Sequence, residues 1–211
     1  MTHFNRRQFG LLLASGAATL ALPTYLRAQA KPKVVVIGGG AGGATAARYI
    51  AKDSKGDIDV TLIDASEMFT TCFFSNLYLG GYRDFASITH GYDRLESNYG
   101  IKKITDYATA VDRAAKTVTL ADGSSVPYDR LVVSPGIDLI YDSVEGYSEE
   151  AAQIAPHAWK AGPQTQLLKA KLDAVKDGEQ IVMVTPPNPF RCPPGPYERA
   201  SMMAHLLKSR G

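Results

Sequence analysis

A run of glycines between an apolar segment and a helical segment constrains this chain more than any other feature of its sequence. Residues 34–37 read VVVI, residues 38–43 read GGGAGG, and a helical pattern follows over residues 44–51. A short β-branched apolar run predicts a buried strand, so the predicted order is strand, glycine turn and helix. This order is typical of a Rossmann-like fold of the α/β class, in which the turn binds a dinucleotide.

Three of these glycines have separate physical roles in such a turn. Gly38 permits the tight turn, Gly40 lets the backbone approach a pyrophosphate, and Gly43 lets the helix pack closely on the strand. A second strand is predicted over residues 60–63 and leads into Asp64, 21 residues after Gly43. An acid at this spacing binds an adenosine ribose hydroxyl and repels a 2′-phosphate, so we expect FAD or NAD rather than NADP. A glycine turn without a ligand is the alternative, and it is disfavoured because strand, helix and acid agree.

Short alternating strands are predicted after residue 101. The letters ADG at 121–123 predict a hairpin turn between strands at 117–120 and 126–128. The letters LVVSPG at 131–136 predict a buried strand that ends in a loop containing Pro135 and Gly136. The predicted domains are a FAD-binding domain with a β-meander over 31–140, a crossing over 141–163, and the start of a second, incomplete Rossmann-like domain over 164–211.

The second Rossmann-like unit is predicted from a polar helix over residues 164–176, an apolar strand at 181–184 and a helix at 197–208. One face of the last helix is predicted to be apolar, and its side chains are Ala200, Met203, Ala204 and Leu207. A single strand and helix cannot bury both faces of a sheet. We therefore expect this sequence to be the N-terminal part of a longer protein, or a truncated copy, and we expect the chain alone to be inactive.

The loop before the last helix differs from a nucleotide-binding turn. Prolines replace the glycines, at positions 186, 187, 189, 193, 194 and 196. Proline removes a backbone donor and fixes φ, so pyridine-nucleotide binding at this second unit is disfavoured.

The first thirty residues predict a twin-arginine export signal. Arg6 and Arg7 precede an apolar run over 11–22, and AQA at 28–30 offers a small-residue cleavage site after Ala30. The run is shorter than the roughly 20 residues that span a bilayer, so no membrane span is expected. We expect a periplasmic protein, with an uncleaved amphipathic anchor as the alternative.

Charge and cysteine content narrow the function classes. Without the three arginines of the signal, the chain has 20 basic and 21 acidic residues, which gives no support to nucleic-acid binding. The only cysteines are Cys72 and Cys192. In an oxidising compartment, the simplest interpretation is a structural disulfide between them. Cys72 could equally be a small core hydrophobe beside Phe73 and Phe74.

Several long strings resemble the flavoprotein subunit of flavocytochrome c sulfide dehydrogenase. They are TTCFFSN (70–76), HGYD (90–93), EGYSEEAA (145–152), PHAWKAG (156–162) and RCPPGPYERAS (191–201). The resemblance runs from Lys33 to the end of the sequence and is far more specific than the glycine motif alone.

The resemblance implies that the sulfur of Cys72 is joined to the 8-methyl carbon of FAD. The eight residues from Asp64 to Cys72 can reach about 26 Å when extended, which is enough to run from the ribose to the far edge of the flavin. A disulfide between Cys72 and Cys192 would conflict with this link. The resemblance also implies a c-type cytochrome subunit as electron acceptor. Because the sequence has no CxxCH motif, the haem is expected on that partner.

By the same resemblance, Cys192 is half of a redox-active disulfide whose second cysteine lies further downstream. Sulfide would attack this disulfide as HS⁻ and leave a persulfide, and the freed thiolate would reduce the flavin. Pro196 suits the start of a helix, whose positive end would favour a thiolate at Cys192. Glu198 could exchange protons near the sulfur, or could simply stabilise the first helical turn.

No metal site is predicted, and His90, His157 and Trp159 are expected to be structural. Three other functions stay open. A sulfide:quinone oxidoreductase shares the fold but needs a membrane-binding surface, of which the sequence shows no amphipathic sign. An NAD-linked disulfide reductase is disfavoured by the proline loop and by the lack of a CxxxxC pair. A non-catalytic flavoprotein fragment is the third.

Overall fold

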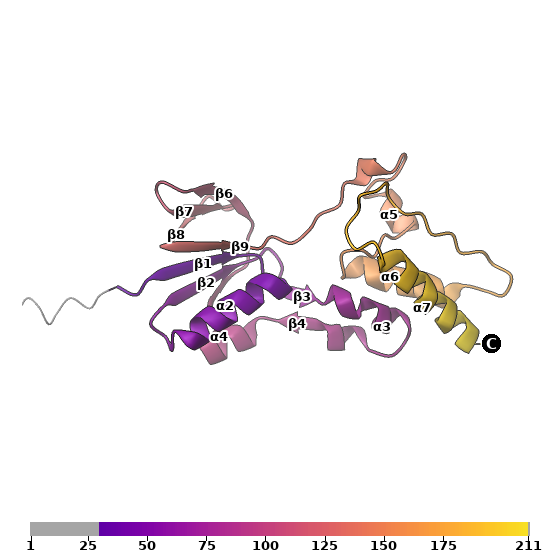
Figure 1. Cartoon of the computed structure of the whole chain (residues 1–211), viewed down its shortest axis with the longest axis horizontal. Helices are drawn as coiled ribbons and strands as arrows, with labels where there is room; N and C mark the ends of the chain where they lie inside the picture. The colour runs from indigo at the N-terminus through magenta and orange to yellow at the C-terminus, as the bar shows by residue number, and fades with distance from the viewer. Residues whose placement is uncertain (1–29, 211) are drawn as a thin grey trace, which may run out of the picture. The chain divides into compact units, whose positions relative to one another are not determined.

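A four-stranded parallel sheet forms around the strand that precedes the glycine run (Figure 1). The computed structural model describes residues 30–210, so the predicted export signal lies outside the described residues except for Ala30. The strands are β1 (Lys33–Ile37), β2 (Asp59–Ile63), β5 (Lys102–Ile104) and β9 (Arg130–Val133), in the order β5-β2-β1-β9. This confirms the predicted Rossmann-like α/β class, while the domain boundaries stay a prediction.

The side chains of β1 alternate between two cores because successive strand residues point to opposite faces of a sheet. Val34 and Val36 pack with helix α2 (Ala41–Asp53) and with residues of α4 (Asp93–Tyr99). Val35 packs on the other face, against the β-meander. Since both faces of β1 are covered, an uninterrupted apolar run is the pattern that fits it.

The meander is an antiparallel sheet of β6 (Ala108–Asp112), β7 (Thr117–Leu120) and β8 (Ser125–Pro127). It confirms the hairpin predicted at ADG. The prediction that the strand before Ser134 is buried was wrong, because β9 is only partly covered and Val133 is 62% exposed. β9 is an edge strand, so its side chains have fewer neighbours.

Residues 68–91 lie outside the parallel sheet, between its strands β2 and β5 in sequence. Strand β3 (Met68–Thr70) pairs with β4 (Thr89–Gly91) in antiparallel fashion. Between them lie η1 (Cys72–Phe74), α3 (Ser75–Leu79) and η2 (Phe85–Ile88). Cys72 therefore stands at the start of a short helical excursion.

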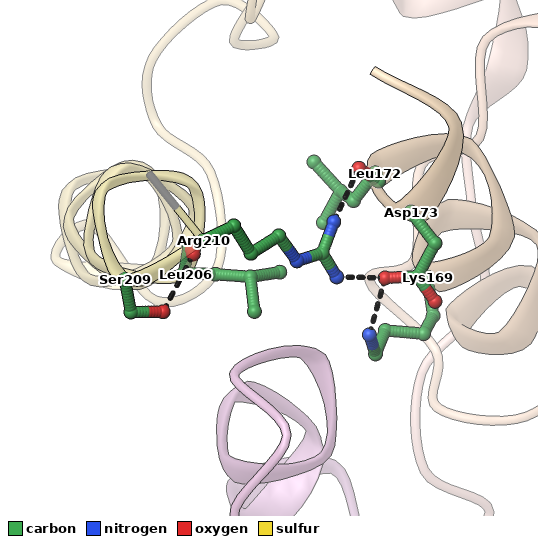
Figure 2. A network of polar contacts seen from close by, with 6 residues as sticks. All are labelled: Lys169, Leu172, Asp173, Leu206, Ser209 and Arg210. Carbon is green, nitrogen blue, oxygen red and sulfur yellow. Dashed lines mark hydrogen bonds and ion pairs between the residues drawn. The ribbon is translucent and has the colours of Figure 1, made fainter. Parts of the chain in front are cut away.

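The helical excursion packs against the last two long helices. Leu79 of α3 forms a buried cluster with Leu172 of α6 (Pro163–Ala174) and with Met203 and Leu206 of α7 (Gly195–Ser209). Arg210, which follows α7, donates to the carbonyl oxygen of Leu172 over 3.1 Å and pairs with Asp173 of α6, as Figure 2 shows. Lys169 pairs with the same carboxylate.

Both helices predicted near the end of the chain are confirmed, but the buried face of α7 differs from the prediction. Met203 is buried as expected, whereas Ala200 and Ala204 are exposed and Leu206 is buried instead. The contacts with α3 and α6 select the face that carries Met203 and Leu206, three residues apart.

The strand predicted at 181–184 was wrong. This segment pairs with no strand in residues 30–210, and Val182 and Val184 are 72% and 73% exposed. A β-branched run becomes a strand only where a neighbour satisfies its backbone groups. The predicted crossing holds η3 (Tyr141–Ser143) and α5 (Ala151–Ile154). Among the described helices, none has the length and apolar character needed to cross a bilayer.

Candidate functional site

The glycine turn lies at the carboxyl edge of the parallel sheet. Gly38 has a φ of +97°, and a Cβ there would overlap the carbonyl oxygen of Ser134, which follows β9. A Cβ on Gly43 would overlap the carbonyl oxygen of Gly38. Neither position can therefore carry a side chain. This agrees with the roles predicted from the sequence, the tight turn for Gly38 and close helix packing for Gly43.

Gly40 is different because its surroundings are open. A Cβ there would meet only the ring of Phe69, at 3.7 Å. Gly40 is the N-cap of α2, no side chain caps that helix, and its first turn carries no acid. The first backbone N–H groups of α2 and the positive end of its dipole can therefore receive an anion such as a pyrophosphate.

Asp64 reaches the same turn from the end of β2. Its Oδ2 accepts a hydrogen bond of 2.6 Å from the amide of Gly39, and its Oδ1 accepts one of 2.8 Å from the amide of Ser66. Each carboxylate oxygen keeps a lone pair that can accept from a ribose hydroxyl. Pro135 also lies at the turn, beside Gly38, and Gly136 follows it with a φ of +82° in open space.

Two side chains that the sequence did not single out support this turn. The Tyr92 hydroxyl donates to the carbonyl oxygen of Gly39 over 3.0 Å. Burial raises the pKa of Tyr92 to about 12, and the charge of Asp64 adds to the effect. Lys103 donates to the carbonyl oxygen of Asp64 over 2.8 Å, and its ammonium lies 4.9 Å from the centre of the Tyr92 ring. Burial lowers the pKa of Lys103. The negative charges of nearby carboxylates, most of all that of Asp64, oppose this shift.

Cys72 is exposed at the first position of η1. Its carbonyl oxygen accepts a hydrogen bond of 2.6 Å from the Ser75 hydroxyl, which closes the turn. The interpretation of Cys72 as a core hydrophobe was therefore wrong. The neighbouring rings of Phe73 and Phe74 pack edge to face, and Phe73 is itself 64% exposed.

Cys192 is also exposed and free, so the structural disulfide between the two cysteines was wrong. It has a φ of +61°, and its carbonyl oxygen accepts from the amide of Gly195, the first residue of α7, over 2.9 Å. A Cβ on Gly195 would lie 3.2 Å from both the Cys192 sulfur and Cη2 of Trp159. The sulfur thus lies beside the start of a helix and close to an indole ring.

Arg199 connects the two cysteine segments, and the sequence prediction missed it. Its guanidinium donates to the hydroxyl of Ser75 over 3.1 Å and to Oδ1 of Asn76 over 3.0 Å. It also donates to the carbonyl oxygen of Ala158 over 2.8 Å. Burial lowers the pKa of Arg199, and attraction to the Cys192 sulfur opposes this shift. The one available signal was the position of Arg199, one turn into the helix that follows Cys192.

Glu198 and His157 are sequence neighbours of two residues in this connection, Arg199 and Ala158. Glu198 is exposed in the first turn of α7 and lines an open cavity of about 540 Å³ with Asn76, Tyr197, Ser201, Met202 and His205. His157 accepts a hydrogen bond of 3.0 Å at Nδ1 from the Trp159 amide. Burial lowers the pKa of His157, and Lys160 and Arg199 add to the effect. His90 is exposed on β4, and residues 30–210 hold no metal-binding cluster of His, Cys, Asp or Glu.

Comparison with known proteins agrees with this architecture. Residues 32–183 match the family model described as pyridine nucleotide-disulphide oxidoreductase. The chain belongs to this family. Residues 165–211 match a second model, described as the central part of the sulfide dehydrogenase (flavocytochrome c) flavoprotein chain.

The chain is similar to the sulfide-quinone reductase of Aquifex aeolicus, 33% identical over 181 residues. The aligned region covers 84% of this chain and 40% of that protein. The sulfide dehydrogenase (flavocytochrome c) flavoprotein chain of Chlorobaculum thiosulfatiphilum is 50% identical over 44 residues, which are 21% of this chain and 90% of that sequence.

Among solved structures, the sulfide:quinone oxidoreductase of Aquifex aeolicus has a TM-score of 0.63 at 29% identity and covers 85% of this chain. This chain covers 40% of that structure. It therefore spans about two fifths of the length of the sulfide-quinone reductase that it matches.

Membership of the pyridine nucleotide-disulphide oxidoreductase family supports a flavin cofactor. The glycine turn fits the dinucleotide part of FAD. Gly40 and the uncapped start of α2 can receive the pyrophosphate, and Asp64 can receive a ribose hydroxyl.

Proposed function

We propose that this protein oxidises sulfide as the flavin-binding chain of an oxidoreductase. FAD would be held at the glycine turn and joined to Cys72, and sulfur would react at Cys192. A c-type cytochrome subunit would accept the electrons. The observation that carries the proposal is the contact of Arg199 with Ser75 and Asn76, which brings the Cys72 turn against the helix that follows Cys192.

The two cysteines suit separate tasks. Cys72 is exposed and lies on the excursion that follows β3, so its thiol is free to bond to a flavin. Cys192 is exposed beside Trp159 and next to the start of α7. FAD, when bound, supplies a two-electron acceptor that can pass single electrons onward.

The chemistry at Cys192 is thiol-disulfide exchange. The proposal pairs Cys192 with a second cysteine that the resemblance puts further downstream. HS⁻ attacks a sulfur of that disulfide, the S–S bond breaks, a new S–S bond forms a persulfide, and the second thiolate leaves. The negative charge that HS⁻ brings departs on the thiolate, so charge balances. Glu198, on the first turn of α7, is the proposed proton-exchanging group.

Two candidate functions differ in the electron acceptor, which is a cytochrome in one and a quinone in the other. The match of residues 165–211 supports a cytochrome partner. The two comparisons with sulfide-quinone reductase support a quinone equally well. The predicted twin-arginine signal supports the periplasm as the location.

The test uses the purified flavin-loaded protein without oxygen. Stopped-flow absorbance should show that sulfide bleaches the flavin and that NADH does not. Bleaching by NADH together with no response to sulfide would overturn the proposal. After reduction by sulfide, rapid reoxidation by cytochrome c rather than by a soluble ubiquinone analogue supports the cytochrome acceptor, and the reverse supports the quinone.

A further inference from the structure

Arg199 of α7 binds two other segments of the chain through one planar group. Its Nε and Nη2 donate to Asn76 and Ser75 at the Cys72 turn, and its Nη1 donates to the carbonyl oxygen of Ala158. Ser75 in turn donates to the carbonyl oxygen of Cys72. A guanidinium presents its donors in a fixed fork, so these bonds fix the Cys72 turn relative to α7.

All three acceptors of Arg199 are neutral, although charges taken out of water are usually paired. The ion pairs among residues 30–210 join Lys160 to Asp138, and Lys169 and Arg210 to Asp173. Arg199 is in none of them. Burial lowers the pKa of Arg199, and the group whose attraction opposes this is the sulfur of Cys192.

The other charged groups near Arg199 do not act as a partner for its guanidinium in place of the Cys192 sulfur. His157 and Lys160, on the loop before α6, carry either no charge or a positive one. Burial lowers the pKa of His157, and Lys160 and Arg199 add to the effect. Glu198 is next to Arg199 in sequence but is exposed and makes no ion pair with it. Arg199 lies four residues after Gly195 and therefore on the same face of α7, and a Cβ on Gly195 would lie 3.2 Å from the Cys192 sulfur. The unmatched positive charge is thus on the helix face beside which this sulfur lies.

We propose that Arg199 is a positioning residue that holds the Cys72 turn against α7 and supplies the counter-charge for an anionic sulfur at Cys192. The inference rests on the proposed function, because exchange with HS⁻ passes a negative charge through the sulfur atoms at this position. The hydrogen-bonding fork and the charge are separable by substitution.

The variants are Arg199→Gln, which removes the charge, and Arg199→Lys, which keeps the charge but removes the fork. Arg210→Gln is the matched control, since it removes an arginine that follows the other end of α7 and binds Leu172 and Asp173. Far-ultraviolet circular dichroism and thermal unfolding check that each variant folds. If Arg199→Gln does not fold, Arg199→Lys still tests the fork.

The first measurement is the rate at which iodoacetamide alkylates Cys192 at pH 7, read by mass spectrometry, in protein whose disulfides have been reduced with dithiothreitol and from which the reductant has been removed. The thiolate is the reactive form. We expect Arg199→Gln to react about tenfold more slowly, and Arg199→Lys and Arg210→Gln to stay within about threefold of the unmutated protein. Equal alkylation rates of Cys192 in Arg199→Gln and Arg210→Gln at pH 7 would overturn the proposal that Arg199 supplies the counter-charge.

The second measurement is hydrogen-deuterium exchange of residues 72–80. Both Arg199 variants should exchange faster there than the unmutated protein, whereas Arg210→Gln should not. Unchanged exchange in Arg199→Lys would overturn the positioning role.

Reduction of the flavin by sulfide separates this inference from the proposed function. If the unmutated flavin-loaded protein does not respond to sulfide, the proposed function fails whatever the alkylation rates are. If it responds and Arg199→Gln responds at the same rate, the inference alone fails.

Discussion

The hydroxyl of Tyr92 donates a hydrogen bond of 3.0 Å to the carbonyl oxygen of Gly39, whose own amide donates to Asp64 over 2.6 Å. The peptide groups on both sides of this glycine are therefore held by side chains from two different segments, the one that follows β2 and the one that precedes α4. A Cβ on Gly39 would also collide with the Tyr92 ring. The shape of the turn depends on Tyr92 as much as on the glycines.

Replacing Tyr92 by Phe keeps the ring and removes the hydroxyl. It leaves the carbonyl oxygen of Gly39 without this buried donor, so we expect the free energy of unfolding to fall by about 1–2 kcal/mol. Urea unfolding measures the change. Tyr107→Phe is the control, because Tyr107 is 70% exposed, and it should change stability by less than about 0.5 kcal/mol. An equal effect of both substitutions would contradict the role of Tyr92.

The same tyrosine predicts a pH dependence in alkaline solution. Its pKa in the folded protein is raised to about 12, above the value near 10 of an unfolded chain, so the folded state favours the neutral phenol. This contribution to stability is complete below about pH 10 and is lost as the pH rises toward 12. We expect the unmutated protein to lose more stability than Tyr92→Phe between pH 10 and 12, measured by urea unfolding.

Gly43→Ala and Gly40→Ala form a matched pair on the glycine turn. At Gly43 the new methyl group would overlap the backbone of Gly38, so we expect a loss of more than about 2 kcal/mol of stability. At Gly40 the nearest atom is 3.7 Å away, so the fold should tolerate the methyl group. Binding of FAD to Gly40→Ala should nevertheless weaken, because the methyl group occupies the space expected for the pyrophosphate. Thermal unfolding and flavin content test both substitutions, and wild-type flavin content in Gly40→Ala would refute this assignment.

His157 predicts a loss of stability in acid. Burial lowers its pKa in the folded protein, and its Nδ1 accepts the Trp159 amide only while that nitrogen is unprotonated. Stability from this group is present above about pH 6.5, the ordinary value, and is lost as the pH falls below it. His157→Asn offers an oxygen that does not titrate, so its stability should fall less than that of the unmutated protein between pH 7 and 5. His90→Asn, at an exposed position, should follow the unmutated protein.

Cys72→Ser tests the proposed flavin bond. After acid precipitation of the flavin-loaded protein, the yellow colour should stay with the unmutated polypeptide and move to the supernatant in the variant. Cys192→Ser is the control and should retain the colour. Colour released from the unmutated protein would refute a covalent bond at Cys72.

The predictable parts of this molecule are those whose determinants are neighbours in sequence. Gly43 packs against Gly38 within one turn, Gly38 adopts the positive φ of that turn, and the apolar run before them forms β1, so the turn and the strand could be predicted. Arg199 could not, because its contacts with Asn76 and Ser75 span 123 and 124 residues. Tyr92 reaches Gly39 across 53 residues.

The wrong predictions share a physical cause, which is dependence on neighbours in space. Residues 181–184 have the composition of a strand but no described partner to pair with. The buried face of α7 is set by its contacts with α3 and α6, which cover Met203 and Leu206, rather than by the predicted apolar face that contained Ala200 and Ala204. Cys72 stands beside two phenylalanines yet is exposed, because the excursion turns it away from the cores.

The bonds that Asp64 and Tyr92 make to Gly39 have a consequence for how the cofactor is acquired. Both hydrogen bonds are made by the protein's own side chains, so the glycine turn is preorganised before the cofactor binds. Binding of a nucleotide therefore does not have to pay the entropy cost of ordering this part of the main chain. Docking would then be a lock-and-key event, with association limited by diffusion and desolvation instead of by rearrangement of the loop.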